Sequence, residues 1–557
     1  MIETTYWTKR RIGRRSVLRG ASVGAVGLAG AALIGCGDSD DDDDGAEGPA
    51  GASTAAATNT VVASATADSS GAQRGGELKV VFAADPTGLD PSTSRGGGDH
   101  NWLYSMFENL VNNGPNFTVE PGISDSWEVV DDLTIRFHTR TGFKYQDGSD
   151  FSTEDIRYTI ERHQDPETQS YAAGQVQSIS EVEVIDAENV VLHLNTITSP
   201  LFAILGDRAG MILPRDATEA AGADFTNRPV GSGPFKLTDW QIDASLHLER
   251  FADYWNEGYP YLDSIQFEIV PNASVQFANL RTGAADYINV DPKDRAEARN
   301  LSDIQYEEWT STGYTQINTN VALWPNNDVR LRQAMTYALN RPAVLEGIFF
   351  GEGELANGPL TRATWAFNSD LAPIEEDLDR AKQLLDAAGY PDGIEFEMVI
   401  VANDTNTPFA EMIKAQWVRA GIDVTLVARS AEEAGAEYRN QQYPIYLVGF
   451  SGRADPDMTL FENFHSRGAF NRVIYNDEYA PDDLQLALDA KIEQGRSLYD
   501  QEERKPIYDD IQRQIVEEGH GIFFTHSTNA VGISQRVNGF TPYGDGKDRL
   551  HQLWLTG

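Results

Sequence analysis

Apolar and polar residues alternate in several short segments of the chain, which is the pattern of a strand with one buried face. Residues 133–139, 394–401 and 421–428 follow this alternation. Residues 77–83 and 443–450 hold longer apolar runs and predict strands that are buried on both faces. We therefore expect the chain to contain at least one substantial sheet.

Helices are indicated by capping residues and by apolar positions three or four residues apart. Ser152, with Asp155 three positions later, predicts a helix that runs to Ile160, and Asp328 predicts one that ends near Asn340. A third helix with one apolar face and a terminal glycine is predicted from Leu378, Ala381, Leu385, Ala388 and Gly389. Because strands and helices are mingled along the chain, we expect an α/β or mixed fold.

Residues 1–35 have the pattern of an export signal. Basic residues, including the pair Arg14 and Arg15, precede a weakly apolar stretch from Gly20 to Gly35. That stretch is too short and too rich in glycine to remain as a spanning helix, which needs about 20 apolar residues. The pair resembles a twin-arginine signal, and the segment that ends at Cys36 resembles a bacterial lipobox, in which the cysteine is lipidated after cleavage. A buried cysteine in an ordinary helix is the alternative.

Composition places the folded part of the chain after residue 74. Residues 36–74 are rich in Asp, Gly, Ala, Ser and Thr, so we expect a disordered acidic tether between the lipid and the folded body. The rest of the 557-residue chain is long enough for two or three domains. Cys36 is the only cysteine, so we expect no disulfide in this exported protein.

Charge and motifs exclude several function classes. The net charge of −41 repels phosphates, which argues against a nucleic-acid partner and against membrane contact beyond the acyl anchor. Residues 449–453 lack the last glycine of a Gly-x-Ser-x-Gly nucleophile elbow. The histidines are scattered, and the nearest pair, His520 and His526, flanks a predicted strand rather than forming a zinc motif. We therefore expect no enzyme activity, no metal site and no cofactor.

Eight motifs follow one another between residues 75 and 557. They are GGELKVVFAADPTGLDPS, MFENLVNNG, the segment 119–162, PVGSGPFKL, DYWNEGYPYLDSIQFEIVPN, DVRLRQAMTYALNR, DRAKQLLDAAGYPDG and ADPDMTLFENF. Each motif is a weak signal alone. Their order resembles that of the peptide/nickel type (family 5) of extracellular solute-binding proteins, the receptors of ABC importers.

The resemblance implies a two-lobed type II periplasmic-binding-protein fold, cluster C-like, with an additional subdomain in lobe I. Lobe I would comprise residues 75–115, 228–310 and 523–557, the inserted subdomain 116–227, and lobe II 311–522. Two chain crossings between the lobes would form a hinge that closes around a ligand.

The resemblance also implies the partners and the location. We expect a monomer that is anchored to the outer face of the cytoplasmic membrane and works with ABC permease and ATPase subunits. A peptide or peptide-like compound is the default ligand. An organic anion, an oligosaccharide or a nickel chelate stays open, as does a sensing role in place of transport.

The ligand is expected to meet the segment that begins with Gly449 and Phe450. Peptide-binding relatives carry an aspartate for the ligand's ammonium group shortly after a Gly-Trp pair at this place. Arg453 stands at the aspartate's position here, and Asp455 matches only after a shift of two residues. Arg453 therefore either binds a ligand carboxylate or phosphate, or neutralises Asp455 and Asp457.

Further ligand contacts are expected from the same segment and from the facing loop 92–102. Phe450 would form an apolar wall, and the loop glycines would let backbone approach the ligand. The remaining candidates are Gly449, Ser451, Asp455, Asp457, Gly97, Gly98, His100 and Trp102.

Overall fold

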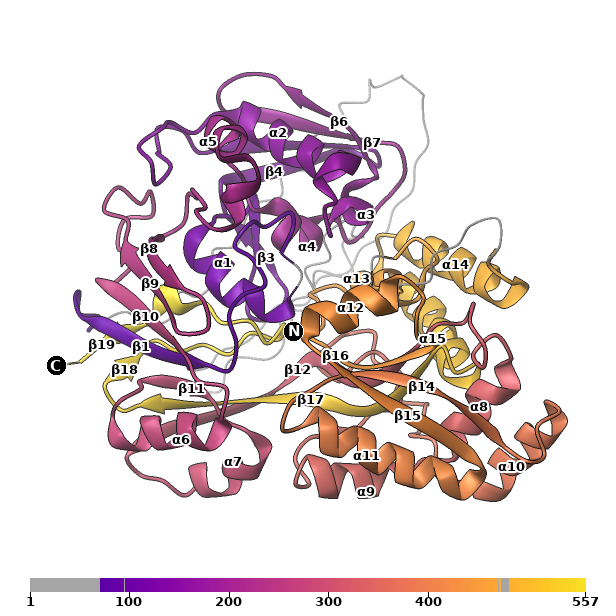
Figure 1. Cartoon of the computed structure of the whole chain (residues 1–557). Coiled ribbons are helices and arrows are strands. Elements are labelled where there is room, and N and C mark those ends of the chain that lie inside the picture. Colours follow the sequence, from indigo (N-terminus) through magenta and orange to yellow (C-terminus); the bar gives the residue numbers. More distant parts are fainter. Residues whose placement is uncertain (1–70, 95, 469, 472–479, 557) are drawn as a thin grey trace, which may run out of the picture.

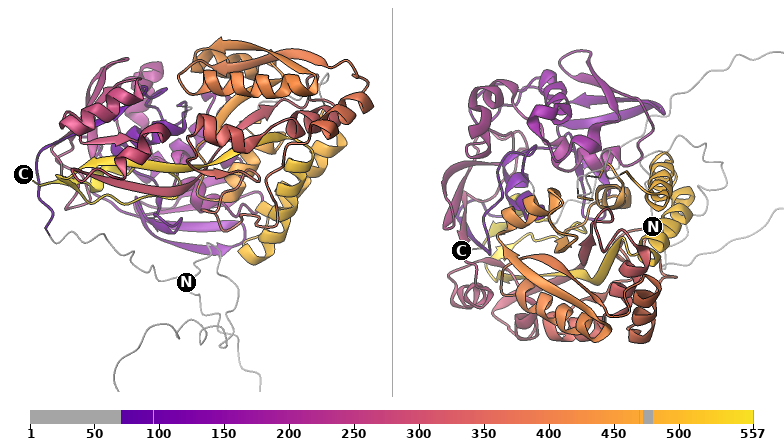
Figure 2. Two further views of the ribbon diagram at one scale, coloured as in Figure 1. Left: turned by 90° about the horizontal axis from the view of Figure 1, so that it is seen from below. Right: turned by 45° about the vertical axis from the view of Figure 1, so that its right-hand side comes forward.

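The centre of the molecule is one large mixed sheet. The computed structural model describes residues 71–94, 96–468, 470–471 and 480–556. Two long antiparallel strands, β12 (Ile304–Thr319) and β17 (Gly521–Ser534), run side by side through the middle of the sheet. Figure 1 shows them joining the two ends of the molecule, and the view from below in Figure 2 shows β17 in yellow along the same path.

The two ends of this sheet come from different parts of the chain. Beyond β17 the order continues through β11 (Tyr287–Asn289), β1 (Glu77–Phe82), β10 (Ser264–Ile269), β9 (Ser245–Arg250) and β8 (Phe235–Gln241). Beyond β12 it continues through β16 (Ile445–Phe450), β14 (Ile394–Val401) and β15 (Ile422–Arg429). Four of the five predicted strands, β1, β14, β15 and β16, therefore lie in this one sheet.

The pairing of β12 with β17 is interrupted near the middle of both strands. The register shifts between Thr310 and Tyr314 on β12, which pair with Thr528 and His526 on β17. On one side of this irregularity, β11 pairs with the later part of β17. On the other side, β16 pairs with the later part of β12. The two halves of the β12–β17 pair therefore belong to opposite ends of the sheet. A register irregularity bends a ladder, so this is where the sheet changes direction.

A second sheet of four antiparallel strands lies above the first end in Figure 1. Its order is β4 (Ser124–Asp131), β5 (Thr134–Thr139), β7 (Asn189–Leu194) and β6 (Ile179–Val184). The helices α2 (Thr153–Gln164), α3 (Ala173–Val176), α4 (Leu201–Leu205) and α5 (Arg215–Ala221) belong to the same part. The predicted strand 133–139 is confirmed as β5.

The apolar core of this second sheet reaches across to the other end of the molecule. Ala454 and Met458, which follow β16, belong to the same buried cluster as Phe137 and Phe202. Met458 lies on α13 (Pro456–Phe464). The segment after β16 thus packs directly against the part of the chain that contains β4 to β7.

The other elements cover the large sheet or connect its strands. The helices are α1 (His100–Met106), α6 (Ala273–Thr282), α7 (Pro292–Ala298), α8 (Val329–Tyr337), α9 (Arg341–Ile348), α10 (Leu378–Ala387), α11 (Asn406–Trp417), α12 (Ala431–Arg439), α14 (Asp483–Arg496) and α15 (Gln501–Glu517). The short strands are β2 (Val111–Asn113), β3 (Val119–Pro121), β13 (Glu354–Leu355), β18 (Val537–Asn538) and β19 (Trp554–Leu555).

The predicted helix starts are confirmed, whereas two of the ends differ. Ser152 caps α2 as expected, and the backbone N–H of Ser152 donates to the Asp155 carboxylate over 2.9 Å. The helix continues past Ile160 to Gln164. Asp328 caps α8, which ends at Tyr337 rather than near Asn340. The reason is that Asn340 caps the next helix, α9, by accepting from a backbone N–H in its first turn.

In the described ranges, no helix is both long and apolar enough to cross a membrane. The predicted export signal, the lipidated Cys36 and most of the tether lie outside the described residues.

Candidate ligand-binding site

A cavity of about 450 Å³ lies between the loop before α1 and the turn after β16. Gly97 and Gly98 line it from the loop, and residues 448–451 with Arg453 line it from β16 and its turn. Residues of β12 between Tyr314 and Asn318 form a further side. Small-molecule sites have volumes of about 300–1,000 Å³, so this cavity fits a small solute. Its walls come from both ends of the large sheet.

Two buried polar side chains in the wall have no hydrogen-bond partner among the described residues. Gln316 is 1% exposed, and neither its Oε1 nor its Nε2 is paired. The hydroxyl of Tyr314 is also unpaired, and burial raises the pKa of Tyr314 well above its usual value. An unpaired buried polar group costs about 1–3 kcal/mol, so a small movement of the wall that exposed these atoms to a hydrogen-bonding solute or to water would be favoured.

Arg453 is the only charged side chain among the described residues that line the cavity. Its Nη1 donates to the Ser451 hydroxyl over 3.2 Å and to the Gly452 carbonyl over 2.7 Å. Its guanidinium carbon lies 5.0 Å from the ring centre of Phe450 and 6.0 Å from that of Phe470, within reach of cation–π attraction. The turn and the two rings thus fix the arginine at the edge of the cavity.

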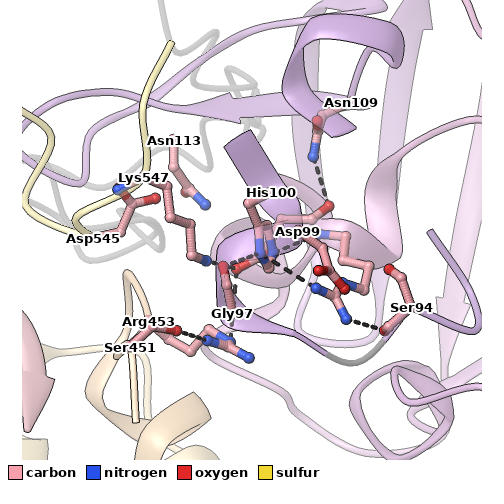
Figure 3. A network of polar contacts seen from close by, with 12 residues as sticks. Ser94, Gly97, Asp99, His100, Asn109, Asn113, Ser451, Arg453, Asp545 and Lys547 are labelled. Atoms are coloured by element: carbon pink, nitrogen blue, oxygen red, sulfur yellow. Dashed lines mark hydrogen bonds and ion pairs between the residues drawn. The ribbon is translucent and has the colours of Figure 1, made fainter. Parts of the chain in front are cut away.

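Behind Arg453 lies a buried charge cluster centred on Asp207. Figure 3 shows Arg453, His100 and Lys547, three side chains of this cluster, close to one another. The Asp207 carboxylate accepts hydrogen bonds from Nε2 of His100 and, over 2.8 Å, from Nζ of Lys547. Arg453 approaches it more loosely, with its Nε 3.8 Å from Oδ2. Burial opposes the ionised form of Asp207, but its hydrogen bonds and nearby cations hold its pKa well below the usual value.

Glu462 of α13 borders the same cluster. Its Oε2 lies 3.8 Å from Nη2 of Arg453, and its Oε1 accepts from the side chain of Gln175 in α3. Burial raises the pKa of Glu462 to about 7, although the charge of Arg453 opposes this shift. Near neutral pH the carboxyl is therefore divided between its protonated and ionised forms.

Comparison with known proteins shows the family to which this chain belongs. A sequence model described as bacterial extracellular solute-binding proteins, family 5 (middle region), matches residues 118–471. The chain is a family 5 solute-binding protein. The heme-binding protein A of Haemophilus influenzae is 28% identical over 511 residues, covering 85% of this chain and 91% of that protein. The dipeptide-binding protein of Escherichia coli is 26% identical, covering 78% and 86%.

Solved structures of similar shape have the two-lobed fold of these binding proteins. The DppA protein of Helicobacter pylori in complex with the peptide STSA has a TM-score of 0.80, with 23% identity over 87% of this chain and 98% of that one. AgaA of A. tumefaciens in complex with agropinic acid has a TM-score of 0.78, with 24% identity over 86% and 99%. The predicted α/β, two-lobed fold is therefore confirmed.

Family membership also fixes the coarse function. Family 5 proteins bind small solutes or peptides outside the cytoplasm and work with the permease and ATPase subunits of ABC importers. The predicted solute-binding role is confirmed at this level.

Six of the predicted contact residues lie together in the cavity wall. They are Gly97, Gly98, Gly449, Phe450, Ser451 and Arg453. The close approach of the two sides requires a glycine at position 97, because a Cβ there would lie 2.4 Å from Oγ of Ser451. No atom of the described residues lies within 4 Å of the Cβ position of Gly98.

His100 and Trp102 do not line the cavity, contrary to expectation, because α1 turns both side chains inward. His100 is fully buried, and burial lowers its pKa well below the usual value. In the neutral ring, Nε2–H donates to Asp207 and Nδ1 can accept from Nη2 of Arg208, 3.3 Å away. Trp102 packs in the core with its ring centre 5.1 Å from that of Phe82.

Asp455 and Asp457 are also absent from the described wall, and neither carboxylate pairs with Arg453. Asp455 accepts from Arg504 through both oxygens, over 3.0 and 2.7 Å. Asp457 accepts from Arg496 over 3.0 Å. Of the two alternatives for Arg453, the structure therefore does not have the one in which it neutralises these acids, because arginines from α14 and α15 pair with them instead.

Several residues of the site were missed in the sequence. Gln316 and Asn463 line the cavity, and Asp207 and Lys547 form the cluster behind it. No local motif marks them, since Asp207 and Lys547 are 340 positions apart. Only the polar residues of β12, in a strand that is otherwise buried, were a visible signal.

Proposed function

We propose that this chain is a lipid-anchored receptor that captures a small, peptide-like solute in the cavity beside Arg453 and delivers it to permease subunits. The two unpaired polar side chains in the cavity wall, Gln316 and Tyr314, carry the proposal. A wall with unsatisfied polar atoms is costly when empty and favours a hydrogen-bonding solute. The lipid anchor at Cys36 and the monomeric state belong to the same proposal.

Release of the solute requires the two sides of the cavity to separate. We assign residues 75–115, 228–310 and 523–557 to lobe I, 116–227 to its subdomain and 311–522 to lobe II. The two strands that join the lobes, β12 and β17, have their register irregularity beside the cavity, where Ser527 lines it. A bend at this position would open the cavity without breaking the rest of the sheet.

The test is a thermal-shift screen of the full chain in which Cys36→Ser removes only the lipidation site. The screen comprises di- to pentapeptides, sugars, organic acids and metal chelates. A solute that binds only the folded state raises the melting temperature by mass action. Calorimetric titration of each positive solute should give one site per chain, and Gln316→Leu should weaken binding. Turnover of a bound peptide or ester, abolished by one serine or histidine substitution, would contradict a pure binding role.

A further inference from the structure

The charge of the cavity wall restricts the solute. Among the described residues of the wall, the polar side chains other than Arg453 are neutral, with amides at Gln316, Asn318 and Asn463. No aspartate or glutamate belongs to that wall. A solute inside the cavity therefore meets one positive group and several neutral hydrogen-bonding groups.

Arg453 is the cation that a solute in the cavity would meet. Among the described residues its hydrogen bonds are made by Nη1, to Ser451 and Gly452. Its Nε and Nη2 face carboxylate oxygens of Asp207 and Glu462 behind the wall at 3.8 Å, which is beyond hydrogen-bond distance. No carboxylate of the described residues is therefore hydrogen-bonded to the guanidinium, and a solute carboxylate on the cavity side can form a charge-assisted pair with it.

The nearby acids are not available to a positively charged solute. Asp455 and Asp457 are occupied by Arg504 and Arg496. Asp207 is occupied by His100 and Lys547. Glu462 lies behind Arg453 and contacts Gln175, and burial favours its protonated form.

From this geometry we propose that the solute is a carboxylate anion that pairs with Arg453 and places no ammonium group in the cavity. The inference rests on the proposed function and gives its solute a chemical class. A carboxylate in a partly dry cavity needs a charge-assisted partner, which Arg453 supplies. An ammonium group in the same cavity would be repelled by Arg453 and would find no carboxylate to pair with.

The experiment uses one skeleton in four charge forms. The probes are Ala-Ala, N-acetyl-Ala-Ala, Ala-Ala-amide and N-acetyl-Ala-Ala-amide. A second set, gluconate, glucose and glucosamine, covers a solute that is not a peptide. We expect the N-acetylated acid to bind at least as tightly as free Ala-Ala, and amidation of its carboxylate to weaken binding about 10- to 100-fold. If the anion is sugar-like, gluconate should bind more tightly than glucose and glucosamine.

Variants test whether Arg453 causes the preference. Arg453→Gln should remove the difference between acid and amide, whereas Arg513→Gln, an exposed residue of α15, should retain it. Gln316→Glu adds a carboxylate to the wall and should shift the preference towards the forms that carry an ammonium group. If Arg453→Gln fails to fold, the charge preference of Gln316→Glu still tests the inference.

The outcomes separate the inference from the proposed function. Tighter binding of a zwitterion or cation than of its matched anion would overturn the inference. Binding of neutral or cationic solutes in the wider screen, with no carboxylate bound, would also overturn it and leave the receptor function in place. If no solute of any class binds, the proposed function itself fails.

Discussion

Arg504 donates to both carboxylate oxygens of Asp455, over 3.0 and 2.7 Å, and both side chains are almost completely buried. The pair joins α15 to the first turn of α13, where Asp455 is also the N-cap and accepts from the backbone N–H of Asp457 over 2.9 Å. The acid that aligns most nearly with an ammonium-binding aspartate therefore has a structural role in this chain.

Removal of Arg504 should destabilise the folded state strongly. Arg504→Met leaves the buried carboxylate of Asp455 without its cation, and loss of one partner of a buried pair costs about 3–5 kcal/mol. The measurement is the free energy of unfolding in denaturant. The exposed Arg513→Gln on the same helix is the control and should change it by less than about 0.5 kcal/mol.

A second substitution distinguishes the buried charge from lost packing. Asp455→Asn in the Arg504→Met background removes the unpaired charge and retains an N-cap residue. The double variant should therefore be more stable than Arg504→Met alone. Equal instability of the two would show that the packing of Arg504 against Trp365 and Tyr508, rather than its charge, stabilises this region.

The approach of the loop before α1 to the turn after β16 should be sensitive to a single methyl group. A Cβ on Gly97 would lie 2.4 Å from Oγ and 2.9 Å from Cβ of Ser451. Overpacking of this kind costs about 1–3 kcal/mol, and each 1.4 kcal/mol is about a tenfold change in affinity. Gly97→Ala should therefore weaken solute binding about tenfold in calorimetric titration.

Gly98 provides a matched control, because a Cβ there would meet no atom of the described part of the chain within 4 Å. Gly98→Ala should change the affinity less than Gly97→Ala does. Ser451→Gly, combined with Gly97→Ala, should restore much of the loss because it removes the atoms that clash. Equal effects of the two alanine substitutions would mean that the close approach at Gly97 is unimportant for binding.

Glu462 should make the folded state less stable as the pH rises through neutrality. Burial raises the pKa of Glu462 from 4.5 to about 7, so between these values the folded state holds a proton that the unfolded state has lost. This contribution is complete below about pH 4.5 and is lost as the pH rises through about 7. One such group changes the free energy of unfolding by about 1.4 kcal/mol per pH unit within that window.

The check is the free energy of unfolding between pH 5 and pH 8 in the parent and in Glu462→Gln. The free energy of unfolding of the parent minus that of Glu462→Gln should fall as the pH rises through this window. The difference isolates Glu462, because both proteins keep the buried Glu108, whose pKa is raised to about 7, and the buried histidines, whose lowered pKa gives the opposite dependence below about pH 6.5. Glu411→Gln, on an exposed position of α11, is the control and should keep the parent's slope.

The sequence predicted those parts of the fold that depend on local patterns. Alternating residues in 394–401 mark β14, and Ser152 marks the start of α2, because pleating and capping act over a few residues. Helix ends were less predictable. The end of α8 is determined by the cap of the following helix, which competes for the same residues.

Residues of the cavity wall such as Gly97 and Phe450 could be predicted, because their place in the sequence motifs determines where their backbone lies in the fold. The partners of buried charges were not, since a sequence does not reveal which distant side chain will meet a given carboxylate. His100 meets Asp207 across 107 positions, and Asp455 meets Arg504 across 49. These tertiary contacts decide which polar residues remain available to a solute.

Cys36 should determine whether the protein stays with the membrane. If it receives acyl chains, each buried CH₂ contributes about 0.8 kcal/mol and two or three chains anchor the protein stably. The parent should then be found in the membrane fraction and incorporate labelled fatty acid. Cys36→Ser should do neither, whereas Ser39→Ala, three residues away, should behave like the parent. Because the mature chain is strongly acidic, electrostatic attraction to anionic lipid cannot replace the anchor. Membrane retention of Cys36→Ser without fatty-acid labelling would therefore point to a protein partner in the membrane instead of a lipid.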